Sequence, residues 1–191
     1  TSNGSHLIRS GNEFINEPRV ANVDSSFFDV FPLASIEGNT KTALLEPNTV
    51  VINETTAKKY FHTTHALGKT VEVKNGQTTI PYKVTAVIED IPRQSHFNLD
   101  FMFSMKNADY QWGQMTSHNF HTYLLLKPGT DPVAFQKNFD VYIEKYVLPS
   151  VQQFMKIGSM DEFKKSGNNL AYTLMPITKI HLYSDYSFEL N

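Results

Sequence analysis

The residues best suited to chemistry in this sequence are histidines with the spacing of a metal-binding pair. His62 and His65 are three residues apart, and so are His118 and His121. Two histidines on one face of a helix can bind zinc together. His118 and His121, however, fall in a segment with the alternation of a strand, where their side chains would point to opposite faces, and no carboxylate is placed as in HExxH. We therefore interpret these histidines as surface or half-buried residues and predict no metal site.

A second candidate is the run Ala66-Leu67-Gly68-Lys69-Thr70, which ends like a phosphate-binding loop. Thr63 stands where that loop requires its first glycine, a predicted helix precedes the run and a predicted strand follows it. Phosphate is bound where a strand leads through the loop into a helix, because the start of the helix points its backbone N–H groups at the anion. The run is therefore predicted to be a structural turn, and no nucleotide site is expected here.

Nucleophilic catalysis has no recognisable motif. The sequence has no GxSxG elbow and no cysteine, which excludes a thiol nucleophile, a disulfide framework and a thiolate zinc site. Glu89 and Asp90 are adjacent, so in a strand their side chains are directed apart and are expected to end the strand. Met155, Met160 and Phe163 fit core packing, or an adaptable apolar contact patch as the alternative. We assign no catalytic, cofactor-binding or metal-binding residue, and we predict no cofactor and no enzyme.

Composition narrows the possible partners. The 191 residues carry a formal net charge of −2, and the 17 lysines and arginines are scattered without a basic run. This pattern argues against a nucleic-acid surface and against a polybasic membrane patch. No apolar stretch approaches the ~20 residues that span a bilayer, and the N-terminal residues lack the regions of a signal peptide. The cysteine count leaves the redox compartment open.

The centre of the chain shows the clearest order of elements. Residues 50–52 predict a short strand, Asn53 a helix cap, and the spacing of Ala57, Tyr60 and Phe61 a short helix. Asn75-Gly76 predicts a tight hairpin between two alternating strands. On the return strand Tyr82, Val84, Ala86 and Ile88 are predicted to share one face, opposite Lys83, Thr85 and Val87.

The flanking regions predict both strands and helices. Residues 19–23, 118–127 and 170–175 are predicted strands, and Asp24 is predicted to cap a short helix whose Phe27, Phe28 and Phe31 lie in the core. Residues 97–105 predict a strand with Phe97, Leu99, Phe101 and Phe103 on one face.

The longest helix is predicted after residue 130. Asp131-Pro132 begins it and Pro149 ends it, and its apolar stripe consists of Phe135, Phe139, Tyr142 or Ile143, and Tyr146. A second helical stretch is predicted to extend to about residue 165.

Six segments in this order resemble the MacB-like periplasmic core domain of MacB/FtsX-type ABC transporter permeases, in its Bacteroidetes-type form. They are VDSSFFDVFPLASIEG, VVINETTAKKYF, ALGKTVEV, YKVTAVIEDIPRQSHFNLDF, HNFHTYLLLKPGTDP and PITKIHLYSD. The resemblance implies a two-lobed α+β domain. It assigns residues 1–45 and 106–191 to a porter-like α/β lobe, with the N-terminal part truncated, and residues 46–105 to an inserted small β-rich lobe.

The resemblance also implies a setting. The domain would lie in the periplasm of a Gram-negative bacterium, between the first two membrane helices of an inner-membrane permease. Its partners would be a cytoplasmic ABC ATPase, a second copy of the permease, and a periplasmic adaptor or substrate protein. The expected function is transmission of ATP-driven movement, for export or mechanotransmission. The alternatives are a periplasmic ligand-binding or sensory module, which a deep apolar pocket would favour, and a hydrolase without a readable motif. The transported substrate stays open.

Overall fold

The computed structural model describes residues 2–92, 94–107, 120–155 and 159–180. The described residues form two compact units. The sheet unit contains residues 2–92, 94–107 and 120–123, and the helical unit contains residues 124–155 and 159–180. The combination of a mixed sheet with helices confirms the predicted α+β class.

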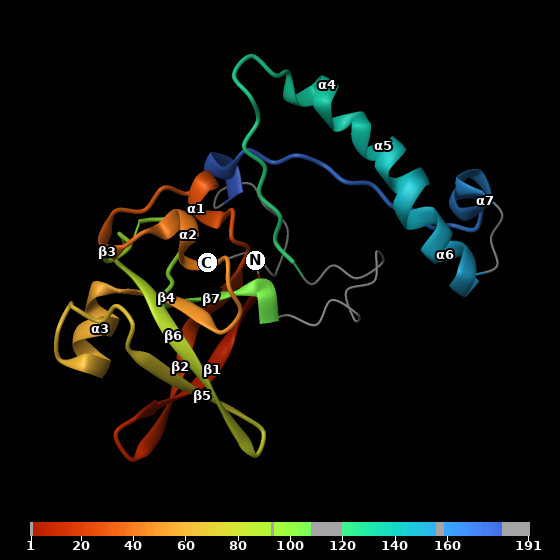
Figure 1. The fold of residues 1–191 in the computed structure, drawn as a ribbon. Helices are drawn as coiled ribbons and strands as arrows, with labels where there is room; N and C mark the ends of the chain where they lie inside the picture. The colour runs from red at the N-terminus through yellow and green to blue at the C-terminus, as the bar shows by residue number, and fades with distance from the viewer. Residues whose placement is uncertain (1, 93, 108–119, 156–158, 181–191) are drawn as a thin grey trace. The chain divides into compact units, whose positions relative to one another are not determined.

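The sheet unit is built on a seven-stranded sheet with the order β3-β6-β4-β7-β2-β1-β5 (Figure 1). Its strands are β1 (Ser2–Ser10), β2 (Glu13–Val23), β3 (Ser35–Gly38), β4 (Thr49–Asn53), β5 (Thr70–Asn75), β6 (Thr78–Ile88) and β7 (Phe101–Ser104). The β2–β7 and β4–β6 pairs are parallel and the others antiparallel. Because β5 pairs with both β1 and β6, the sheet closes on itself, and β3 lies outside this ring on β6.

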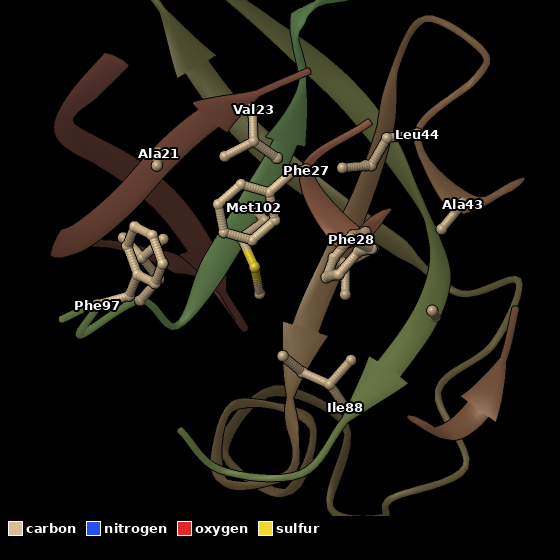
Figure 2. Packing of buried hydrophobic residues seen from close by; sticks show 12 residues of the cluster. Ala21, Val23, Phe27, Phe28, Ala43, Leu44, Ile88, Phe97 and Met102 are labelled. Atoms are coloured by element: carbon tan, nitrogen blue, oxygen red, sulfur yellow. The ribbon is translucent and has the colours of Figure 1, made fainter. Parts of the chain in front are cut away.

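Helices cover both faces of the central strands. α1 (Phe27–Val30) and α2 (Thr40–Ala43) contribute to one apolar core, and α3 (Glu54–Phe61) contributes to the other. Figure 2 shows the first core, where Phe27, Phe28 and Leu44 gather around Met102. The 3-10 turn η1 (Met105–Asn107) follows β7.

The two cores explain why β4 is buried along its whole length. Val50 and Ile52 point into the α3 core, whereas Val51 points into the α1–α2 core. A strand that is covered on both faces has consecutive apolar residues in its sequence, as in the segment VVI.

The predicted face of β6 is wrong because the strand contains a bulge. Val50 pairs with Val84 and Val51 pairs with Ala86, so Thr85 is an extra residue. The hydroxyl of Thr85 donates to the carbonyls of Ala43 and Val50. A bulge reverses the direction of the side chains beyond it, and Val84 and Ala86 therefore lie in different cores.

The single face predicted for residues 97–105 is also wrong. Phe97 and Leu99 lie in the α1–α2 core and Phe101 and Phe103 in the α3 core, and the strand begins only at Phe101. The reason is Asp100, a buried residue whose side chain binds neighbouring segments before the ladder starts.

Two local predictions are shifted in position. The hairpin turn consists of Gly76 and Gln77, since Asn75 still pairs with Thr78, and only Gly76 has a positive φ, of 58°. The N-cap of α1 is Ser26, and the carboxylate of Asp24 instead accepts hydrogen bonds from the Ser26 N–H and hydroxyl. These two bonds lower the pKa of Asp24.

The predicted strand at residues 19–23 is the end of the longer β2, whose hairpin with β1 the sequence did not reveal. The predicted cap Asn53 is confirmed, because its side chain accepts from the Thr56 N–H at 2.9 Å.

The lobe boundaries at residues 45/46 and 105/106 stay a prediction, and strands from both sides of residue 45 share one sheet in the structure.

The helical unit is organised around a nearly continuous helix (Figure 1). Its segments are α4 (Pro132–Gln136), α5 (Asn138–Tyr142), a π-helical turn η3 (Ile143–Val147) and α6 (Leu148–Met155). The shorter α7 (Met160–Lys165) and the 3-10 turn η4 (Ile177–Lys179) follow. Asp131 begins α4 as predicted, with Pro132 in its first turn and the Asp131 carboxylate accepting from the Val133 N–H.

Pro149 does not end this helix, contrary to the prediction. It lies in the first turn of α6, directly after the π-helical turn in which the Leu148 N–H donates to the Ile143 carbonyl. Proline lacks an N–H and disrupts the regular hydrogen bonding one turn before it. The wider turn at residues 143–147 accommodates this disruption, so the chain continues as a helix.

The buried stripe of the long helix consists of Ile143, Val147 and Val151, which pack against Phe163. Tyr142 and Tyr146 of the predicted stripe are exposed, and Phe135 and Phe139 are half-buried. Residues 170–175 form no strand; instead Leu170 and Tyr172 pack against this core. Residues 120–127 form no strand either, and residues 118–119 of that prediction lie outside the described residues.

Candidate functional site

The histidine pair at residues 62 and 65 lies in a turn and not on a helix. α3 ends at Phe61, and His62 follows it in the left-handed conformation with φ 57°. His65 is exposed, with its Nδ1 3.6 Å from a carboxylate oxygen of Glu37. Among the described residues no group of three metal-ligating side chains converges. His118 lies outside those residues, so the second pair stays untested.

The loop that resembles a phosphate site uses its backbone amides internally. The Gly68 N–H donates to the Val84 carbonyl at 2.8 Å, and the Lys69 N–H donates to the Ala66 carbonyl at 3.0 Å. The Lys69 ammonium lies over the ring of Phe61. A loop binds phosphate through free N–H groups, so this arrangement is that of a structural turn.

Asp90 has a structural partner at the start of α3. Its carboxylate accepts from the Thr55 N–H at 2.9 Å and from the Thr55 hydroxyl at 2.6 Å. A carboxylate at a helix N-terminus satisfies an unpaired N–H and interacts favourably with the helix dipole. Asp90 therefore supports the helix, whereas the backbone N–H of Glu89 donates to the Ala34 carbonyl.

The principal buried polar cluster is centred on Asp100. Its carboxylate accepts from the Arg19 guanidinium at 2.7 and 2.8 Å and from the Asn53 side-chain amide at 2.9 Å. Asp100 is 7% exposed, and its backbone N–H donates to the Arg19 carbonyl. The cluster joins β2, the end of β4 and the residue before β7, and both oxygens of the Asp100 carboxylate have a partner in it.

A second carboxylate, Glu17 of β2, contacts α3. It accepts from the Lys59 ammonium and from the Tyr60 hydroxyl, and it is 5% exposed. Burial and the hydrogen bond to Glu17 raise the pKa of Tyr60. The prediction from sequence missed both carboxylates, because partners 42 to 81 residues apart leave no local signal.

An aromatic cluster surrounds α1 in the sheet unit. Phe31 packs edge-on against Phe97 and Tyr123, with ring centroids 4.5 and 5.0 Å apart, and Phe27 also contacts Phe97. The His96 Nε2 and the Tyr123 hydroxyl are 2.8 Å apart. The predicted core role of Phe27 and Phe28 is confirmed, whereas Phe31 is only half-buried.

The helical unit has several exposed apolar residues, which form the candidate contact site. On its long helix Val133 is 73% exposed, Val141 63%, Tyr142 41% and Tyr146 46%. Further exposed apolar residues of this unit are Leu124, Leu125, Met175 and Ile177. A contiguous patch of large apolar side chains is typical of sites that contact another protein or an apolar ligand, and these residues are the candidates for such a patch.

None of the helices in the described part of the chain has both the length and the apolar character needed to cross a bilayer. Exposed apolar residues also occur in the sheet unit, where Leu7, Ile36, Leu45 and Leu67 are 40–48% exposed.

The solved structures with a similar fold include two transporter domains. A domain of a permease protein from Porphyromonas gingivalis is 18% identical, with a TM-score of 0.55 over 76% of this chain and 66% of that one. The periplasmic region of MacB from Actinobacillus actinomycetemcomitans is 16% identical, with a TM-score of 0.52 over 83% of this chain and 75% of that one. The chain thus spans about two thirds of the Porphyromonas domain. Comparison with curated proteins gave no match.

The sequence comparison decides the family. Residues 1–141 match the family described as the MacB-like periplasmic core domain, which is most of the chain. The predicted resemblance is confirmed by this match and by the two similar folds. The chain belongs to the MacB-like periplasmic core domain family.

Proposed function

We propose that the chain is the extracytoplasmic domain of an ABC transporter permease and transmits ATP-driven conformational change to a substrate or partner protein in the periplasm. The observation that carries this proposal is the family match over residues 1–141. In this proposal the ATPase is a separate cytoplasmic chain or domain, and membrane helices outside these 191 residues connect it to the domain. The intact transporter is a homodimer in the inner membrane of a Gram-negative bacterium.

The packing of the sheet unit supports a mechanical role. β4 is buried on both faces, and the ring of strands is closed through β5. Close-packed interiors have low compressibility and pass displacement on without local collapse. A movement applied to one strand would therefore move the unit as a whole.

The helical unit supplies the proposed contact with a periplasmic partner. Val141, Tyr142 and Tyr146 offer apolar and aromatic area on a helix with exposed Lys137 and Glu144 beside it. Aromatic residues with a polar rim are enriched at protein interfaces. The partner is accordingly a protein, either an adaptor or a protein substrate.

Distances between spin labels test the transmission. A label at Lys137, which is exposed between α4 and α5, is introduced into the intact homodimeric transporter. We expect the distance between the two labels to differ between the nucleotide-free state and the ATP-trapped state of a hydrolysis-deficient variant. A second label at Lys83, exposed on β6, follows the sheet unit in the same states. Identical distributions at both positions would remove the transmission proposal and leave the ligand-binding or sensory alternative.

A further inference from the structure

The contact between α3 and the sheet combines a small apolar contact with hydrogen bonds from several polar groups. Thr56 and Ala57 are its buried residues, and Tyr60 and Phe61 are half-buried. Alanine contributes a single methyl group, and hydrophobic stabilisation scales with the apolar area removed from water. Ala57 is the one fully buried apolar residue of α3, and Tyr60 and Phe61 are covered only in part, so the hydrogen bonds add to an apolar contact of modest size.

The N-terminal end of α3 is fixed by two carboxylates. Asp90 accepts two hydrogen bonds from Thr55, and Asp100 accepts one from the side chain of Asn53, the N-cap. The Asn53 N–H also donates to the Asp100 carbonyl. This end is continuous with the buried strand β4, so it is held by both the main chain and side chains.

The C-terminal half of α3 is held by Glu17. The Lys59 ammonium and the Tyr60 hydroxyl both donate to the same oxygen of this carboxylate. After the helix, the chain is fixed again at Ala66, which is wholly buried, and at Gly68. The contact with Glu17 thus lies between the start of α3, which is fixed, and the loop at Ala66 and Gly68, which is fixed as well.

We propose that residues 58–65 form a latch that opens as a unit while the sheet stays intact, and that Glu17 is the residue that keeps it closed. The Lys59 side chain is 46% exposed, so it can return to water with little rearrangement once Glu17 releases it. Segments with few buried apolar contacts open locally at a lower free energy than the whole domain.

The latch links strands that are not neighbours. α3 follows β4, Glu17 belongs to β2, and β7 lies between these two strands in the sheet. When closed, the latch braces β4 and β2 across β7; when open, it uncovers the side of the core that contains Phe101, whose ring contacts Tyr60. This inference concerns the domain alone and does not depend on the transport proposal.

Hydrogen exchange followed by mass spectrometry on the complete chain tests the latch. In the wild type, we expect the amides of residues 58–62 to exchange faster than those of β4 and β7. Glu17→Gln weakens two hydrogen bonds to a charged group, so exchange at residues 58–62 should rise about tenfold or more with the two strands unchanged. Tyr60→Phe removes one of these bonds, keeps the ring in the core, and should give a smaller rise at the same amides.

A matched control lies on the same helix. Glu54→Gln removes the ion pair with Lys58, whose side chain is 59% exposed, and should change exchange by no more than about twofold. If Glu17→Gln fails to fold, hydrogen exchange at residues 58–62 of Tyr60→Phe becomes the deciding measurement. The proposal is overturned if residues 58–62 exchange in step with β4 and β7, or if the Glu17 and Tyr60 variants affect α3 no more than Glu54→Gln.

Discussion

The sheet unit and the helical unit bury their side chains in different ways. Every residue of β4 is buried, whereas α4 and α5 contain no buried residue. In the sheet unit, pairs such as Val20 with Phe101 join segments that are far apart in the sequence. The helical unit is held by local helix hydrogen bonds and by one buried stripe. This stripe consists of Ile143, Val147 and Val151 and packs against Phe163. The sheet unit is therefore a scaffold fixed by long-range contacts, and the helical unit rests on a smaller core.

The two units also differ in where their charged groups lie. In the sheet unit Glu17 and Asp100 are buried and bind internal partners. In the helical unit the charged residues are exposed, and Val133 and Val141 are exposed beside them. Exposed apolar residues occur in both units, since Leu45 and Leu67 of the sheet unit are 48% and 47% exposed, so the buried carboxylates with internal partners are what distinguishes the sheet unit.

The largest expected effect comes from the scaffold core. Phe101 is 1% exposed and lies between strands β2 and β4. Phe101→Ala should lower the free energy of unfolding of the sheet unit by about 3–5 kcal/mol, because it leaves a cavity that close packing cannot fill. Urea denaturation followed by circular dichroism measures this loss. The exposed control Val133→Ala should stay within about 0.5 kcal/mol, and equal effects of the two variants would contradict the comparison.

Gly38 of β3 tests how tightly the scaffold is closed. It has φ +83°, and a Cβ at this position would lie 2.5 Å from the Thr85 carbonyl oxygen. Gly38→Ala should therefore cost about 2–4 kcal/mol, from backbone strain together with overpacking. Gly4→Ala is the control, since a Cβ there meets no atom within 4 Å. Thermal unfolding of both variants should separate them, and a neutral Gly38→Ala would show that β3 can shift away from the bulge.

Ile143→Ala tests the same comparison in the core of the helical unit. Ile143 is 2% exposed in the core of the helical unit. The variant should destabilise this unit by about 2 kcal/mol, at the low end for such a truncation, because a small core can collapse into the space. Hydrogen exchange should rise at residues 143–151 and stay unchanged in β4. Lys137→Ala, on the exposed side, should change stability by less than about 0.5 kcal/mol. Equal acceleration in β4 would mean that the two units unfold together.

The smallest effect is a pH dependence confined to the scaffold. His6 packs edge-on against Phe103, and burial lowers the pKa of His6 below its usual 6.5. Between this lowered pKa and 6.5 the unfolded chain binds more protons than the folded one, so stability should fall as pH falls through that window and level off below it. Denaturant midpoints from pH 7.5 to about 4.5 measure this fall. His6→Gln should reduce it, and an unchanged slope would assign the pH dependence to other groups.

Some features were determined by sequence neighbours alone. Asn53 before the helix of Ala57 and Tyr60, and Asp131-Pro132 before the long helix, specify where α3 and α4 begin. A cap is a bond between residues two or three apart, so its signal lies within one turn of the chain. The six ordered segments determined the family in the same way, since their order is a property of the sequence.

Other features were decided only by tertiary structure. The extra residue Thr85, the division of residues 97–103 between two cores, and the continuation of the helix past Pro149 each depend on what packs against the chain at that point. The contacts of Glu17 with Lys59 and of Asp100 with Arg19 join residues 42 and 81 positions apart. The periodicity of a sequence predicts the two faces of a strand, but it does not predict which strand will lie beside it. The register between distant strands decides where a bulge forms and which charged residues meet in the interior.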